Sequence, residues 1–228
     1  MDCVMSSQNA FTVDKILDAV GASTMLIDTT NGMVFHLVTH DRTLVLDFNL
    51  EESFFKSLSL KNKCILIPKQ KFYIKKIKEL KIITNEYVMV FEYVFDKYTL
   101  RRRVFYSQST RFVIDFKIDC TGEINSSAMG LALKEIGDHF ATLRVINNTG
   151  EICSEGTIIK FPLTLPTDFS VKVIGGNLKS IFEVSDLFIK MIMSYGPTNL
   201  SINFVLLGNG TKASFFTAIN HNRTSKGA

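Results

Sequence analysis

The order of predicted strands and helices repeats once along the chain, and this repeat limits the possible folds more than any motif does. In residues 1–106 a strand and a helix precede a strand meander, and a second helix precedes another meander. Residues 115–220 have the same order. Alternating apolar residues predict the strands, and apolar residues three and four apart predict the helices. The pattern indicates an α+β fold with two similar subdomains, each with an antiparallel sheet and two helices, although the halves share too little sequence to prove duplication.

Turn signals divide the two halves in the same way. TTNG (29–32) and NNTG (147–150) each follow the first helix and one strand of their half, and both are expected to be turns. In TTNG, the Asn-Gly pair readily adopts the positive φ of a hairpin turn. Pro68 suits the first turn of a helix. The polar run at 107–111 opens the expected interdomain connector, residues 107–114, and 221–228 is the expected short disordered tail. The predicted helices cover residues 9–20, 69–80, 126–137 and 175–188.

Composition places the chain among ordinary globular proteins. Hydrophobic residues make up 46% and charged residues 21% of the 228 residues. The four cysteines are scattered and form no CxxC pair, so we expect reduced, buried thiols in an intracellular protein rather than disulfides or a zinc site. The N-terminus lacks a signal-peptide pattern. The most apolar late segment is interrupted by Asp186 and Lys190 and is too short to cross a membrane, so no membrane role is expected.

The positive charge is concentrated in one segment of the first half. Residues 1–112 carry 16 Lys or Arg against 12 Asp or Glu, whereas residues 113–228 carry 10 of each. Eight lysines and a single acid, Glu79, lie within residues 61–81. A local basic surface of this kind is what a polyanionic partner requires.

The predicted helix at 69–80 presents this charge on one face. Lys71, Lys75 and Lys78 are spaced four and three residues apart and would share that face, while apolar residues would form the opposite stripe. Lysines without bidentate arginines favour contact with phosphate groups over reading of bases, so binding would be weak, salt-dependent and independent of sequence. A solvated helix face is the alternative interpretation. The other predicted helices each add one lysine: Lys15, Lys134 and Lys179.

No catalytic pattern stands out. His36 and His40 lie four residues apart on one predicted strand, roughly 13 Å, which is too far for both to ligate one metal. Solvated strand residues are the simpler interpretation of both. Nucleophile-elbow, zinc-protease, phosphate-loop and dinucleotide-binding motifs are absent. We therefore expect a protein that is not an enzyme and has no metal or cofactor.

Several segments resemble the DNA sliding clamps of the PCNA type, and within them the Rad-nine-type subunit of the checkpoint (nine-one-one) clamp. MDCVMSSQNAFTVDKILDAV resembles that subunit's opening strand and helix, and STMLIDTTNGMVFHLVTHDRTLVLDFNLEESFF resembles its next segment. YVFDKYTLRRRVFYSQS resembles its last strands before the connector. GGNLKSIFEVSDLF and NLSINFVLLGNGTKASFFTA resemble its closing helix and strands. Relatives of this type carry a long phosphorylatable tail after the clamp domains, whereas this sequence ends at HNRTSKGA.

The resemblance implies a nuclear, non-enzymatic subunit of a heterotrimeric ring that encircles duplex DNA. Two other clamp-like subunits, a clamp loader, and repair and checkpoint proteins would be its partners. Arg101 and Arg103 would lie at a rim or subunit interface. The hole-facing phosphate contacts would be Lys15, Lys71, Lys75, Lys78, Lys134 and Lys179, and the connector where repair proteins dock would include Ser107, Gln108, Arg111, Phe112 and Ile114.

Three alternatives remain open on the sequence. A replicative PCNA-like homotrimeric clamp would form a stable trimer by itself. An intracellular α+β protein that carries a lipid or small ligand would contain one large internal cavity. An enzyme of unrecognised type is the third, and the missing catalytic constellations argue against it.

Overall fold

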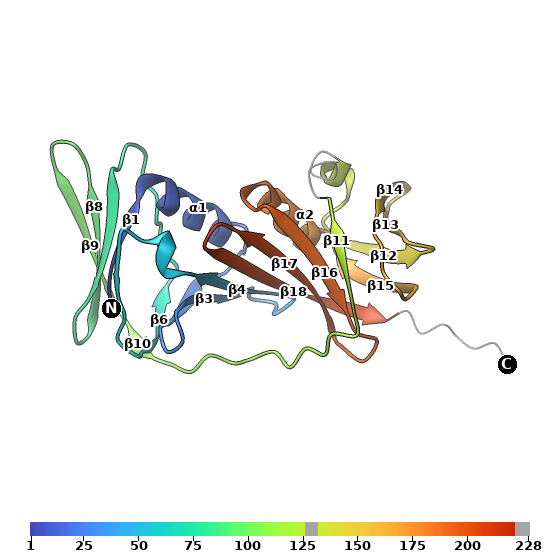
Figure 1. Cartoon of the computed structure of the whole chain (residues 1–228), viewed down its shortest axis with the longest axis horizontal. Coiled ribbons are helices and arrows are strands. Elements are labelled where there is room, and N and C mark those ends of the chain that lie inside the picture. Colours follow the sequence, from blue (N-terminus) through green and yellow to red (C-terminus); the bar gives the residue numbers. More distant parts are fainter. Residues whose placement is uncertain (126–131, 222–228) are drawn as a thin grey trace. The chain divides into compact units, whose positions relative to one another are not determined.

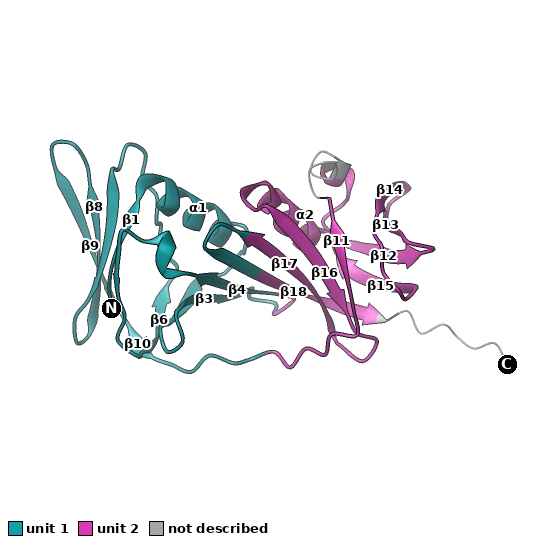
Figure 2. Cartoon of the chain, in the orientation of Figure 1, with its two compact units in different colours: residues 1–41, 45–113, 208–213 teal, residues 42–44, 114–207, 214–228 magenta. Residues whose placement is uncertain are grey.

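The computed structural model describes residues 1–125 and 132–221, and the chain divides into two compact units. Unit 1 comprises residues 1–41, 45–113 and 208–213, and unit 2 comprises residues 42–44, 114–207 and 214–228 (Figure 2).

The first half of the chain forms one α-helix and two antiparallel sheets (Figure 1). One sheet has the strand order β5-β1-β7-β8-β9, and the other contains β10-β6-β2-β3-β4. The elements are β1 (Asp2–Ser6), α1 (Ser7–Asp18), β2 (Thr24–Asp28), β3 (Met33–Val38), β4 (Leu44–Leu50), η1 (Glu52–Phe54), β5 (Ser57–Ser59), β6 (Cys64–Pro68), β7 (Glu79–Thr84), β8 (Val88–Val94), β9 (Thr99–Phe105) and β10 (Ser107–Gln108).

The second half has the strand order β14-β13-β12-β15-β18-β17-β16-β11. The pairs β14–β13, β13–β12, β12–β15, β15–β18, β17–β16 and β16–β11 are antiparallel. The elements are β11 (Cys120–Ile124), η3 (Ala132–Glu135), β12 (Phe140–Ile146), β13 (Thr149–Ser154), β14 (Thr157–Pro162), β15 (Phe169–Ile174), α2 (Gly175–Glu183), η4 (Ser185–Leu187), β16 (Lys190–Tyr195), β17 (Ser201–Gly208) and β18 (Thr211–His221).

The two halves have the same strand topology, which confirms the repeat predicted from the sequence. The pairs β1–β7, β7–β8 and β8–β9 recur as β11–β16, β16–β17 and β17–β18. The pairs β2–β3, β3–β4 and β2–β6 recur as β12–β13, β13–β14 and β12–β15. Six corresponding pairings in the same chain order establish an architectural duplication and confirm the α+β class.

The predicted number of helices is wrong. Residues 69–80 do not form a helix: residues 69–78 form an irregular segment, here called the strap, and Glu79 begins β7. Of the helix predicted at 126–137, the described part contains only η3, and residues 126–131 lie outside the described residues. The described part of the chain thus contains two α-helices, α1 and α2, where four were predicted.

Phenyl rings fill the interior of unit 1. The ring of Phe72, from the strap, lies 5.2 Å from that of Phe35 and 5.6 Å from that of Phe91, both edge-on. All three side chains are fully buried. Rings without polar atoms can be buried in this way without needing hydrogen-bond partners, as the abundance of Phe and the absence of Trp predict.

Two local predictions, a helix cap and a hairpin turn, are confirmed. The side chain of Ser6 caps α1 by accepting a hydrogen bond from the Asn9 amide at 3.1 Å. In the β12–β13 turn, Asn147 and Asn148 both have positive φ, 48° and 61°, as a tight hairpin turn requires. The four cysteines are free, although only Cys3 and Cys120 are fully buried. Within residues 1–125 and 132–221, no helix combines the length and apolar character needed to cross a membrane.

Candidate nucleic-acid interface

The strap is held in an irregular conformation by side chains of neighbouring elements. The amide of Phe72 donates a hydrogen bond to the Asp14 carboxylate of α1 at 2.7 Å. The hydroxyl of Tyr93, on β8, donates to the carbonyl of Lys71. Lys76 has a φ of 72°, a conformation that would end a right-handed helix. These contacts use backbone groups that a helix would have paired internally, which explains why the predicted helix does not form.

Helix α1 lies beside the strap and turns a polar face outward. Its buried stripe includes Val13, Ile16 and Leu17, which follow the predicted helical spacing. The exposed side carries Lys15 and Asp18. Asp18 forms an ion pair with Lys69 of the strap, with 3.3 Å between Oδ1 and Nζ. The amphipathic pattern of the helix therefore determines which of its residues face the solvent.

Aromatic contacts join the same two segments. The rings of Phe11 and Tyr73 meet edge-on at 5.2 Å, and the ammonium group of Lys15 lies over the Phe11 ring, 5.8 Å from its centre. A cation in this position is attracted by the ring. Lys71 and Lys75 lie two residues on either side of Tyr73 and are exposed. The contacts thus bring lysines from α1 and the strap into one neighbourhood, although Lys71 and Lys75 do not share the helical face that the sequence predicted.

Four lysines of this surface have no carboxylate within ion-pair distance among the described residues: Lys15, Lys71, Lys75 and Lys76. Lys78 pairs with Asp96, and this hydrogen bond raises the pKa of Lys78. The sequence interpretation missed Lys76 because a helix would have turned it away from the lysine face. We call Lys15, Lys71, Lys75 and Lys76 the free-lysine patch.

Of the two lysines predicted in unit 2, Lys179 is ion-paired and does not extend this pattern. Lys179, on α2, pairs with Asp138 at 2.7 Å, and this hydrogen bond lowers the pKa of Asp138. Lys134 lies in η3. Among the predicted lysines whose side chains the structure describes, the unpaired ones, Lys15, Lys71 and Lys75, all lie in unit 1, which also carries the excess positive charge of the sequence.

The predicted interface arginines lie on a sheet edge. β9 ends its sheet, and Arg101 and Arg103 lie on the same face because they are two residues apart. Arg101 pairs with Glu92 of β8 at 2.7 Å. Large apolar side chains flank them: Phe105 is 78% exposed, and Tyr87, the residue before β8, is 72% exposed.

The connector begins as a strand and continues as an anchored segment. Ser107 and Gln108 form β10 and pair with β6. Arg111 donates a hydrogen bond to the Asp47 carboxylate at 2.7 Å and lies 3.9 Å from Asp28. The Phe112 ring meets His36 edge-on at 4.8 Å and is half exposed. Ile114, the last predicted connector residue, is half-buried.

His36 is buried, so its interpretation as a solvated strand residue is wrong. Its Nδ1 lies 2.6 Å from Asp47, where it donates a hydrogen bond because an ionised carboxylate can only accept. Burial raises the pKa of Asp47, but hydrogen bonds from His36 and Arg111 outweigh that effect and hold the pKa below its usual range. The alternation of the strand alone could not predict this, because the connector covers the face that would otherwise be exposed.

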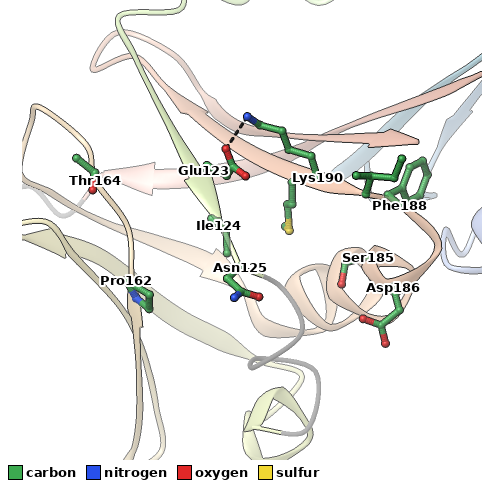
Figure 3. A pocket seen from close by; sticks show the side chains of 11 residues that line it. Glu123, Ile124, Asn125, Pro162, Thr164, Ser185, Asp186, Phe188 and Lys190 are labelled. Carbon is green, nitrogen blue, oxygen red and sulfur yellow. Dashed lines mark ion pairs between the residues drawn. The ribbon is translucent and has the colours of Figure 1, made fainter. Parts of the chain in front are cut away.

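The pocket in Figure 3 lies in unit 2, with a volume of about 680 Å³. It is open to solvent, and an ion pair between Glu123 and Lys190 at 2.5 Å lies on its wall. An open, ion-paired surface pocket is not the enclosed apolar cavity that a lipid carrier needs. Within the described part of the chain, no group of three or more His, Cys, Asp or Glu side chains is placed to hold a metal ion.

Comparison with solved structures identifies the fold. The chain is similar to a structure of the PCNA2–PCNA3 complex from Sulfolobus tokodaii, with a TM-score of 0.79 and 11% identity over 96% of this chain and 99% of that one. PCNA from Entamoeba histolytica gives 0.76 and 11% over 96% and 98%, and PCNA from Thermococcus kodakaraensis gives 0.73 and 13% over 96% and 99%. No family model and no curated protein matches the sequence. The chain therefore has the PCNA-like clamp fold, as predicted.

Proposed function

We propose that the chain is a non-enzymatic subunit of a ring-shaped clamp that encircles duplex DNA. The observation that carries this proposal is the duplicated clamp topology, which matches solved PCNA structures over 96% of the chain. A scaffold of this fold retains DNA by topology, so its surface needs only weak, sequence-independent contacts with phosphate. The free-lysine patch provides such contacts, since point charges without bidentate geometry suit a phosphate backbone.

The finer proposal is a heterotrimeric ring that acts in the nucleus in DNA-damage checkpoint signalling and repair. The resemblance of five sequence segments to the Rad-nine-type subunit supports it. One of the similar structures is a complex of two different clamp chains, PCNA2 and PCNA3, which is consistent with mixed rings on this fold. Loading would need a clamp loader, and repair proteins would dock at the connector, residues 107–114.

Co-purification from the native cell tests the assembly. With the chain tagged at its endogenous level, we expect two other clamp-like chains of similar size to accompany it in equal amounts. Recovery of a homotrimer would favour the replicative clamp. Recovery as a monomer that binds a small molecule would overturn the ring and favour a ligand carrier.

Charge reversal tests the free-lysine patch. We expect Lys71→Glu with Lys75→Glu to weaken retention of the assembled complex on circular DNA. The fall of log K, the DNA-binding constant, with log salt should also become less steep, by about 0.9 for each phosphate that is no longer neutralised. Lys97→Glu with Lys117→Glu is the matched control, because both residues are exposed and the change in charge is the same. Equal retention in the two double variants would remove the patch from the DNA interface.

A further inference from the structure

Two sheets carry a row of alternating charges across neighbouring strands, here called a charge ladder, and each ladder reaches an edge strand, β9 or β14. In unit 1, Lys81 on β7, Glu92 on β8 and Arg101 on β9 lie directly opposite one another. Glu92 is 3.9 Å from Lys81 and 2.7 Å from Arg101. The ladder thus reads cation, anion, cation, and its last cation lies on the edge strand.

Unit 2 carries a ladder of the same sign. Arg144 on β12, Glu151 on β13 and Lys160 on β14 are in register, and β14 ends the order of strands in its sheet. Lys160 lies 3.1 Å from Glu151, and Arg144 also pairs with Glu151. Hydrogen bonds from Lys160 and Arg144 lower the pKa of Glu151, so Glu151 is an anion at neutral pH. Both ladders therefore end in a cation at an edge.

The two edges are also the places where backbone groups are open to pairing. An opposite charge directly across from a residue stabilises a strand pair, and a like charge destabilises it. If β9 of one copy met β14 of another, Arg101 and Arg103 would approach Lys160, and each ladder would continue with a second cation. A strand that presents carboxylates would instead extend both ladders in alternating sign.

Further features of β9 indicate that its edge is a contact surface. Arg103 lies opposite Val90, and no carboxylate of the described residues lies within ion-pair distance of its guanidinium. Beside it, a shallow pocket of about 470 Å³ is lined by residues that include Tyr87, Val90 and Arg103. Phe105 continues the same face and is almost fully exposed. An arginine pair with neighbouring aromatic rings is the composition enriched at protein interfaces.

In the proposed ring, neighbours join through strand edges, and we propose that the charges on the β9 edge select the neighbour: a different clamp-like chain whose edge strand places carboxylates two residues apart opposite Arg101 and Arg103. The same charges exclude a second copy of this chain. The partner's carboxylates would be roughly 7 Å apart along its strand, the spacing of residues i and i+2. This inference rests on the proposed ring, and it adds the chemistry that selects the neighbour. Specificity then comes partly from repulsion, as in other interfaces that discriminate between similar partners.

A charge-swap cycle on the purified chain tests this without DNA. The wild-type chain should sediment as a monomer at tens of micromolar. Arg101→Glu with Arg103→Glu gives an acidic β9 that fits the basic β14 of a second copy, and Lys160→Glu gives an acidic β14 that fits the wild-type β9. Each variant should tighten self-association by about tenfold or more, measured by sedimentation velocity.

Combining all three substitutions restores like charges across the contact, so the triple variant should return to a monomer. Thermal unfolding checks that every variant is folded. Because the two charge reversals lie in different units, the proposal can still be tested with one variant if the other fails to fold. A stable wild-type homo-oligomer, or no self-association in either folded variant, would overturn the proposal. A wild-type homotrimer would leave the DNA clamp intact, whereas failure of DNA retention would leave the edge preference unaffected.

Discussion

The strap and helix α2 occupy the same topological position but have different backbone conformations. The strap joins β6 to β7, and α2 lies between the corresponding strands β15 and β16. Each segment covers its sheet with a buried aromatic ring, Phe72 in the strap and Phe182 in α2. The fold therefore requires a covering side chain at this position, but it does not require a helix.

Local chemistry decides between the two conformations. α2 begins with Gly175, where a Cβ would clash with the carbonyl oxygen of Gly137, so only glycine lets the helix start this close to neighbouring backbone. It continues with Leu178, Ile181 and Phe182 on one buried stripe. The strap instead carries clustered lysines, which repel one another in a helix. Without the helix, lysines such as Lys76 can face solvent at positions that a helical wheel would not allow.

The largest effect is expected at the buried rings. Phe72→Ala and Phe182→Ala should each lower the free energy of unfolding by about 3–5 kcal/mol, because each leaves a cavity in a packed core. Urea titration measures both. Only Phe72→Ala should also expose the strap to trypsin, because Phe72 is the strap's fully buried ring, whereas its ion pair to Asp18 and the Tyr73 ring are partly exposed. Equal trypsin resistance in the two variants would contradict a strap held mainly by that ring.

A smaller loss of stability is expected when the hydrogen bond between Asp14 and the Phe72 amide of the strap is removed. Asp14→Ala leaves the buried Phe72 amide without its acceptor and should destabilise the protein by about 1.5–3 kcal/mol. Burial raises the pKa of Asp14, so Asp14→Asn, which keeps an acceptor without the charge, should cost much less. If the two variants are equally stable in urea titration, the amide contact is not what holds the strap.

The connector anchor gives a pH-dependent effect. Because the folded pKa of Asp47 is lowered, its contribution is present above the unfolded Asp pKa of about 3.9 and is lost as pH falls through the folded pKa. Arg111→Ala should therefore cost about 1 kcal/mol near pH 7, and progressively less below pH 4. Thermal unfolding across pH 2–7 measures this. A cost that stays constant with pH would assign the effect of Arg111 to packing.

The smallest effect distinguishes the strap from a helix most sharply. Lys76→Gly removes the strain of a positive φ and should leave stability unchanged or raise it by up to about 1 kcal/mol. A helix interior would instead lose about 1 kcal/mol. Lys75→Gly is the matched control, because the backbone has no positive φ there. If Lys76→Gly lowers the free energy of unfolding, the result would contradict the irregular strap and support a helix at residues 69–80.

The sequence was sufficient for the features that depend on local patterns. Apolar alternation predicted the strands, the cap at Ser6 and the turn at Asn147 followed from their residue types, and the uneven charge located the basic surface. The repeated order of elements predicted two similar subdomains, and six strand pairings recur because the same element order folds twice. The clamp fold itself was predicted from the segments that resemble known clamps.

What the sequence could not predict depends on contacts between distant residues. The strap is set by Asp14 and Tyr93, which lie 58 and 22 positions from the strap residues they bind. Their polar side chains carry no signal of the partner that they satisfy. Likewise, only the folded sheet shows that Arg101 and Lys160 each end a ladder, because cross-strand neighbours are invisible in a single chain's spacing.

The proposed ring would hold DNA by encircling it. The most direct measurement is retention of the co-purified, loaded complex on closed circular DNA, compared with the same DNA after a single cut, at a salt concentration that removes simple electrostatic binding. Retention on the circle with rapid loss after linearisation is the predicted result. Equal loss from both templates, or equal retention on both, would contradict a ring around the duplex.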